Sequence, residues 1–261
     1  MSEFRLYWRY IRMHFLAELQ YKGWPMKVLF TLFIVLTDPL DALLMLDRFG
    51  AVGGWSASRI MLIYGMALTG FGLAELFGRG LDYFPMLIRN GEFDRILLRP
   101  RSELVQAMTL RFHLNRLARV VGGGALVAVC LAAQGKSYAL MDVLMIALAL
   151  LGGMITYMGL FLIASGVAFF TIQGLDWIYI FSNGSYQLTK VPPKLMPDWI
   201  RRVFLYVMPM LPFCYYPASA ACGWGEPYAL GFVALPASAA FFGLGFLVWK
   251  VGIRHYASTG S

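Results

Sequence analysis

Residues 78–119 read GRGLDYFPMLIRNGEFDRILLRPRSELVQAMTLRFHLNRLAR, and this is the one long stretch of the chain that is too charged to lie in hydrocarbon. It contains eight arginines, whereas the sequence on both sides of it is strongly apolar. A loop this basic between two membrane spans is typical of the cytoplasmic side, because Lys and Arg bias the orientation of membrane proteins. The sequence therefore predicts a cytoplasmic loop over Gly78–Arg119.

The middle of this loop is expected to form a short helix over Glu92–Leu98. Asn90-Gly91 breaks the chain before it, and Pro100 ends it because proline removes a backbone donor. The apolar positions of this helix are Phe93, Ile96 and Leu97. The loop is therefore expected to hold a rigid element with one apolar and one charged face.

A second helix is expected after Pro100. Ser102 is placed to be its N-cap, and Glu103 lies in the first turn, where a carboxylate is favourable. Apolar residues then recur at helical spacing at Leu104, Ala107, Met108 and Phe112. We therefore expect this helix to continue without a break into the next membrane span.

The composition predicts a membrane protein. With 59% hydrophobic and 14% charged residues, the 261-residue chain is too apolar for a soluble domain, in which about a quarter of the residues are charged. The net charge of +8 would suit nucleic acid, but the basic residues flank apolar stretches, where they face anionic headgroups. We expect a single all-α integral membrane domain over residues 1–261 and no nucleic-acid partner.

Residues 1–25 are expected to form an interfacial helix. The apolar positions are Phe4, Trp8, Ile11, Phe15 and Leu19, and the arginines on the neighbouring face are Arg5, Arg9 and Arg12. A helix with two such faces lies in the membrane plane with its arginines toward phosphate. A solvated cytoplasmic helix packed on the rest of the protein is the alternative. No apolar core with a small-residue cleavage site occurs here, so we expect no signal peptide to be removed.

Six membrane spans are predicted, with both termini cytoplasmic. They are Met26–Leu46, Arg59–Phe77, Val120–Gln134, Met141–Phe170, Thr171–Thr189 and Tyr228–Trp249. Between the last two, prolines repeatedly interrupt residues 190–223, and irregular backbone at membrane depth needs protein or water around it. This region is expected to be a re-entrant pair of short helices on the outer side.

Ionisable residues near the ends of the spans have separate expected roles. Glu75, near the inner end of the second span, is expected to pair with an arginine of the following loop, and a role in substrate binding is the alternative. Asp38 and Asp41, toward the outer end of the first span, are expected to face a wet outer vestibule rather than lipid.

Small residues within the spans indicate where helices approach or bend. The glycines at 122–124 allow close approach of another helix, or a bend, and packing is the favoured cause. The fourth stretch is longer than one span needs, so it should tilt or bend near residues 165–166. The three cysteines are expected to be buried apolar residues, with a Cys214–Cys222 pair only if both face outward.

Patterns of catalytic chemistry do not occur in the sequence. It has no zinc-protease helix motif, no nucleophile elbow and no phosphate-binding P-loop, so we expect no enzyme activity and no ATP hydrolysis by this chain. The centres of the spans carry few ionisable groups, which disfavours ion-coupled transport. An ion-coupled carrier or channel without an ATPase partner is the alternative function.

The decapeptide GEFDRILLRP at 91–100 resembles the cytoplasmic signature of bacterial ABC-transporter permeases of the type-two exporter class. The basic N-terminal helix is similar to the interfacial helix of that class, and the proline-interrupted stretch resembles its outer re-entrant helices. The ending YASTGS at 256–261 is similar to the closing Tyr-x-Ser-x-Gly of the family. The resemblance implies a permease that works with separate ATPase subunits.

By this resemblance, the short helix is the coupling helix that docks on an ATPase subunit. Phe93 and Leu97 would insert as apolar anchors. Gly91 and Pro100 would clamp the helix, and Glu92 and Pro100 would also belong to the ATPase-coupling residues. Asp94, Arg95 and Arg99 would form a polar rim or pair within the loop. The alternative is a solvated loop that faces headgroups.

The resemblance also implies the partners and the location of the chain. The ATPase subunits would bring ATP and Mg²⁺, and this chain would hold no cofactor. A second permease, identical or related, would complete the substrate path in the bacterial inner membrane. The aromatic content of 16% suits a hydrophobic or amphiphilic substrate, although aromatic residues at the membrane interface explain much of it.

Overall fold

The computed structural model describes residues 3–40, 43–44, 54–171 and 176–256, and its elements over these residues are helices. They are α1 (Glu3–Gln20), α2 (Trp24–Thr37), α4 (Ala57–Arg89), α5 (Phe93–Leu97), α6 (Glu103–Met108), α7 (Arg116–Ala133), α8 (Leu140–Ala168), α9 (Asp176–Leu188), α10 (Asp198–Arg202), the π-helix η1 (Val203–Val207), α11 (Met210–Cys222), the 3₁₀ helix η2 (Tyr228–Val233) and α12 (Ala234–Arg254). This confirms the all-α class.

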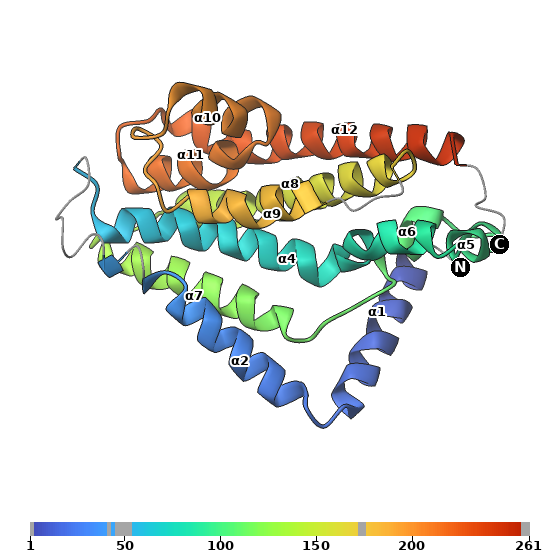
Figure 1. The fold of residues 1–261 in the computed structure, drawn as a ribbon. Helices are drawn as coiled ribbons and strands as arrows, with labels where there is room; N and C mark the ends of the chain where they lie inside the picture. Colours follow the sequence, from blue (N-terminus) through green and yellow to red (C-terminus); the bar gives the residue numbers. More distant parts are fainter. Residues whose placement is uncertain (1–2, 41–42, 45–53, 172–175, 257–261) are drawn as a thin grey trace.

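The long helices form a bundle in which α12, α8, α4, α7 and α2 are successive neighbours (Figure 1). Glycines permit the closest contacts, as they commonly do between membrane helices. A Cβ atom on Gly70 of α4 would lie 2.9 Å from the Cα atom of Gly153 in α8. Cβ atoms on Gly122 and Gly123 would lie 2.5 Å from Val35 and 2.6 Å from Thr69. Packing is therefore the role of these two glycines in α7.

Among the described residues, four helices are long and apolar enough to cross a membrane, namely α4, α7, α8 and the continuous η2–α12 pair. A fifth crossing, or a re-entrant loop, is formed by α10–η1 and α11, which meet at a bend of 97°. The expected first and fifth spans correspond to α2 and α9, whose described helices have 14 and 13 residues. This is a multi-pass membrane protein, and four of the six expected spans correspond to helices of sufficient length and apolar composition.

Helix α4 is longer than the sequence led us to expect. Its 33 residues span about 50 Å, against roughly 30 Å of hydrocarbon, and it runs through the expected loop start at Gly78 as far as Arg89. Pro85 inside it cannot donate to the Leu81 carbonyl. Ser165 of α8 donates to that carbonyl instead, at 2.8 Å, so the interruption is satisfied within the bundle.

The expected unbroken helix from Ser102 into the third span is wrong. Ser102 does cap α6, accepting from the Val105 N–H at 3.5 Å, but α6 ends at Met108 and α7 begins only at Arg116. Phe112 and Leu114 in the intervening segment are both buried in one apolar cluster with Ile11 of α1. Residues two apart do not share a helix face, so a helix here would expose one of them.

Gly166 allows α8 and α12 to pack closely. Helix α8 runs without a break through residues 165–166, and a Cβ atom on Gly166 would lie 2.8 Å from the backbone nitrogen of Trp249 in α12.

The three cysteines, Cys130, Cys214 and Cys222, are free thiols, with Cys214 fully buried in α11. The expectation of buried, unpaired cysteines is therefore confirmed for Cys130 and Cys214.

Helix α1 keeps both an apolar and a basic surface. Ile11 and Phe15 pack on the bundle, whereas Phe4 and Trp8 remain exposed. Exposed aromatic residues favour the interfacial interpretation over a solvated helix, because their burial in the membrane interface is favourable and their exposure to water is not.

Gly80→Ala is expected to lower stability. A Cβ atom at Gly80 would lie 1.9 Å from the Ala107 carbonyl oxygen, so α6 would have to move off α4, and overpacking of this kind costs about 1–3 kcal/mol. Thermal unfolding of the purified protein in detergent measures the effect. Gly124→Ala on α7 is the control, since nothing lies within 4 Å of its Cβ position. Equal melting temperatures for the two variants would contradict this packing.

Candidate functional site

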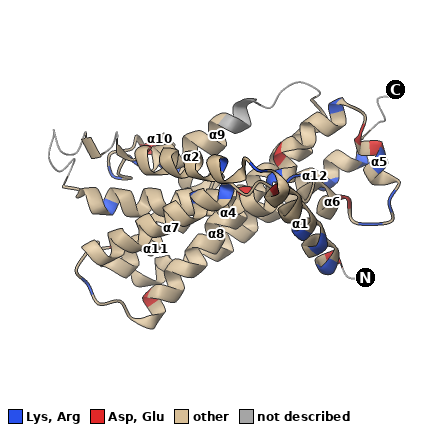
Figure 2. Ribbon diagram, turned by 90° about the horizontal axis from the view of Figure 1, so that it is seen from below, with Lys and Arg blue, Asp and Glu red and all other residues tan. Residues whose placement is uncertain are grey.

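Helix α5 lies at one end of the molecule, beside the described ends of the chain. Figure 2 shows Lys and Arg gathered at the end that carries α1, α5 and α6, while the long helices are largely uncharged. Arg101 lies 3.8 Å from Glu3 at the start of α1, and the Tyr256 hydroxyl after α12 donates to Asp94 of α5 at 2.9 Å. Both described ends of the chain therefore contact the same loop, the one that holds α5.

The turn between α4 and α5 is set by Gly91. Its φ of +68° is the left-handed conformation that favours glycine. The Gly91 N–H bonds to Ile88 at 3.1 Å and the Glu92 N–H to Leu87 at 3.0 Å, which is the Schellman pattern that closes a helix end. The expected break at Asn90-Gly91 is confirmed.

Phe93, on the inner face of α5, belongs to a group of five aromatic rings that we call the aromatic cluster. Its members are Phe84 of α4, Phe93 of α5, Phe169 after α8, Trp249 of α12 and Tyr256. Their contacting ring centroids lie 4.6–5.8 Å apart, the range of favourable aromatic pairs. Helix α5 thus packs, through Phe93, on α4 and on the ends of α8 and α12.

Phe93 belongs to this core and not to the surface. Its exposed fraction is 0%, so the expectation that it inserts into a partner as an anchor does not fit the structure. Leu97 is 41% exposed and Leu98 is 84% exposed, and both face outward beside the exposed Arg95 and Arg99. The apolar surface that α5 offers to a partner is therefore Leu97 and Leu98, of which Leu98 had not been expected.

Gln106 of α6 holds the end of α5 in place by hydrogen bonds, and this role was not predicted from the sequence. Its buried Nε2 donates to the Ile96 carbonyl at 3.4 Å and to the Arg101 carbonyl at 3.2 Å. A lone glutamine on a predicted helix carries no signal for this role, because glutamine is a common helix residue.

Tyr256→Phe is expected to cost about 1.5–3 kcal/mol, because the hydrogen bond to Asp94 is made to a charged group. Burial and the Asp94 carboxylate raise the pKa of Tyr256 to about 12, so this contribution is present below pH 10 and is lost as the pH rises toward 12. Chemical denaturation at neutral pH measures the loss. Tyr206→Phe, at a tyrosine that is 77% exposed, is the matched control and is expected to leave the stability unchanged. Unchanged stability of Tyr256→Phe would contradict the role of this bond.

Glu75 in α4 is buried and receives three arginines. Arg79 of α4 and Arg119 of α7 donate to it, and Arg116 Nη1 donates to Oε2 at 3.1 Å. Arg79 also lies 3.3 Å from Asp82. The expected ion pair of Glu75 with an arginine of the following loop is confirmed.

A second polar group joins α2, α4 and α9 farther from α5. Asp38 accepts from Gln187 Nε2 at 2.9 and 3.1 Å and from the Tyr64 hydroxyl, and Lys190 Nζ lies 3.6 Å from Oδ1. Asp38 is thus a partner of three side chains and not a free vestibule carboxylate. Asp41 lies outside the described residues.

Glu18 connects α1 to the segment before α7. Its carboxylate accepts from the Leu114 N–H at 2.6 Å and lies 3.7 Å from His113 Nδ1. Burial lowers the pKa of His113, and the nearby Arg116 and Arg79 lower it further against the raising effect of Glu18. The lowered pKa favours the neutral ring, which keeps its contact with Glu18 whether or not it is charged.

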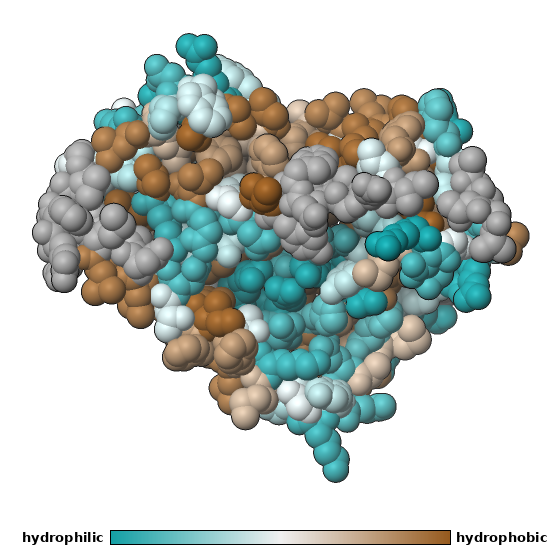
Figure 3. All heavy atoms as spheres, in the orientation of Figure 1, coloured by the Kyte–Doolittle hydropathy of each residue, from teal (hydrophilic) through white to brown (hydrophobic). Residues whose placement is uncertain are grey.

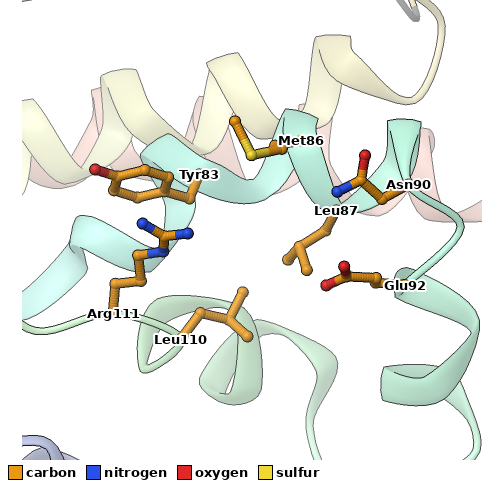
Figure 4. Close-up of a pocket in the computed structure, with 7 residues that line it drawn as sticks. All are labelled: Tyr83, Met86, Leu87, Asn90, Glu92, Leu110 and Arg111. Carbon is orange, nitrogen blue, oxygen red and sulfur yellow. The ribbon is translucent and has the colours of Figure 1, made fainter.

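A cavity of about 200 Å³ opens between the end of α4 and the segment after α6 (Figure 4). It is lined by Tyr83, Met86, Leu87, Asn90, Glu92, Leu110 and Arg111. The Arg111 guanidinium lies over the Tyr83 ring, 4.0 Å from its centroid, and Figure 4 shows Glu92 on the opposite side of the cavity. No three His, Cys, Asp or Glu side chains among the described residues are placed to hold a metal ion.

Comparison with models of protein families shows to which family the chain belongs. The model of a family described as ABC-2 family transporter protein matches residues 32–260, which is most of the sequence. The chain belongs to the ABC-2 transporter family. No match was found among curated proteins or among solved structures. ABC-2 family membership makes this chain a transporter permease, and α1 lies outside the matched region.

Proposed function

We propose that this chain is the membrane-spanning permease subunit of an ATP-driven exporter, and that its ATPase subunits dock on α5. The observation that carries the proposal is the two-sided burial of this helix. Phe93 and Ile96 are buried in the chain's own core, whereas Leu97 and Leu98 are exposed at the charged end of the molecule. A helix that only faced headgroups would not need such a rigid footing on three long helices.

The force of ATP hydrolysis would enter through the aromatic cluster. The expected route from α5 straight into the third span is interrupted by the non-helical residues 109–115. Phe93 instead touches Phe84, Phe169 and Tyr256, which belong to α4 and to the ends of α8 and α12. A displacement of α5 would therefore move these helices first, because close-packed interiors transmit strain.

The topology that fits the proposal has six spans with both termini cytoplasmic in the bacterial inner membrane. Both described ends of the chain contact the loop that holds α5, which supports their being on one side. Helices α2 and α9 would be the first and fifth spans, and the bent pair α10–η1 and α11 would be re-entrant at the outer end. The ATP and Mg²⁺ would be bound by the partner ATPase.

A second permease would cover the face seen in Figure 3. A hydrophilic band crosses this face between apolar margins. A surface of this polarity would not be covered well by lipid tails. A second copy or a related chain would cover it and enclose a path between the two.

Affinity purification from native membranes tests the proposal. We expect an ATPase subunit with a phosphate-binding P-loop and a second permease to be recovered with the chain. Transport by the purified chain alone under an ion gradient would instead establish the ion-coupled alternative. Recovery of the ATPase after deletion of residues 92–98 would show that α5 is not its docking site.

A further inference from the structure

Four arginines follow one face of α4 from the cavity into the bundle, and we call them the arginine ladder. They are Arg111, Arg79, Arg116 and Arg119. Arg111 and Arg79 lie over the Tyr83 ring, at 4.0 and 5.5 Å from its centroid. Arg119 lies at the other end over Phe71, at 4.9 Å. The ladder thus connects the cavity to the membrane-spanning part of α4.

The ladder carries more positive charge than its neighbours neutralise. Its three inner arginines meet two carboxylates, Glu75 and Asp82. Including Arg111 and Glu92, which line the same cavity, adds one charge of each sign and leaves the same surplus of one. The Nε atoms of the three inner arginines are also buried without a hydrogen-bond partner. Because an uncompensated buried charge is strongly unfavourable, an additional anion would stabilise this site.

The depth of the ladder indicates the source of that anion. Glu75 lies 18 residues after the first residue of α4, which is about 27 Å along the helix, close to the inner limit of a hydrocarbon core roughly 30 Å thick. Lipid phosphates of the inner leaflet lie in the headgroup layer just beyond this limit, where long arginine side chains can reach them. Guanidinium groups suit phosphate because their N–H donors match its oxygens.

We propose that the arginine ladder binds the oxyanion headgroup of the transported substrate, and that this substrate is an anionic amphiphile taken from the inner leaflet. The proposal rests on the proposed exporter function and adds the substrate class to it. The cavity beside Tyr83 is the opening, with Arg111 on the side that receives the oxyanion. Glu92 stands on the opposite side, where it disfavours an anion (Figure 4).

Lipid retention by the full-length permease tests the binding step. The protein is reconstituted in bilayers of equal parts phosphatidylcholine and phosphatidylglycerol, and bound lipid is identified by native mass spectrometry. We expect selective retention of phosphatidylglycerol, reduced about tenfold by Arg119→Gln or Arg116→Gln, since each removes hydrogen bonds between charged groups. Arg9→Gln on the exposed face of α1 is the charge-matched control and is expected to retain the lipid.

Asp82→Asn keeps the test decisive if the arginine variants fail to fold. It raises the surplus from one positive charge to two, so retention of phosphatidylglycerol is expected to increase, which loss of structure cannot produce. No preference for phosphatidylglycerol, or an equal loss with Arg9→Gln, would overturn the site. Binding of inorganic phosphate without any preference among lipids would overturn the amphiphile as its ligand.

ATP hydrolysis separates a substrate from a structural lipid. With the co-purified ATPase, phosphatidylglycerol is expected to stimulate hydrolysis in the wild type but not in Arg119→Gln. Retention without stimulation would overturn the substrate assignment. Because the retention assay needs no ATPase, it can succeed when the exporter function fails, and an ATPase that co-purifies without lipid preference would refute the ladder alone.

Discussion

Leu97→Asp combined with Leu98→Asp is expected to abolish recovery of the ATPase subunit with the permease. These two side chains are the exposed apolar surface of α5, at 41% and 84% exposure. Fully burying a leucine side chain contributes about 1.5–3 kcal/mol, so the exposed parts of these two contribute about 2–4 kcal/mol, and losing them lowers the affinity by at least about twentyfold, before the cost of burying carboxylates. Pull-down from membranes followed by quantitative immunoblotting measures the loss.

The matched control is Leu195→Asp, which places the same charge on an exposed leucine in the segment between α9 and α10. It is expected to leave ATPase recovery unchanged. Each variant is first shown to be folded by its elution as a single species in detergent. Normal ATPase recovery with the double variant would show that α5 does not bind the ATPase through these leucines.

Phe93→Ala is expected to have a different effect, because Phe93 is buried. Truncation of a core phenylalanine costs about 3–5 kcal/mol, and here it removes ring contacts at 5.0 Å to Phe84, 5.3 Å to Phe169 and 5.0 Å to Tyr256. The variant is expected to lose stability and to hydrolyse ATP without transport, while the ATPase is still recovered. Denaturant unfolding and paired hydrolysis and transport assays measure these outcomes.

Phe30→Ala on the exposed surface of α2 is the control, and its stability should change by less than about 0.5 kcal/mol. A Phe93→Ala variant that stays as stable as the wild type but loses the ATPase would restore Phe93 as a surface anchor. That result would refute the aromatic cluster as the footing of α5.

Local signals in the sequence predicted the turns around α5 correctly. Gly91 adopts a positive φ, Ser102 caps α6, and α5 ends before Pro100, and each of these follows from the chemistry of one or two residues. The pairing of Glu75 was also predictable, because a carboxylate at the end of a span needs a cation and arginines follow it in the chain.

Long-range packing could not be predicted from the same signals. Phe93 and Leu97 both appear as apolar residues of a short helix, and only the positions of Phe84, Phe169 and Tyr256 decide that Phe93 is the buried one. Helix α4 continues past Phe77, where the predicted span ended because the following residues are charged. Its continuation through Pro85 depends on Ser165 of a distant helix, which donates to the Leu81 carbonyl that Pro85 leaves without a donor.

The bond between Ser165 and Leu81 has a mechanical consequence. Before Pro85, the backbone hydrogen bonds of α4 keep it straight. At Pro85 one of these bonds is missing, and Ser165 of the neighbouring α8 supplies the replacement donor. Sliding of α8 along α4 would break this hydrogen bond and leave α4 free to bend at Pro85, less than two helical turns before Gly91. Helix α4 would thus have a hinge that the position of α8 makes rigid or flexible.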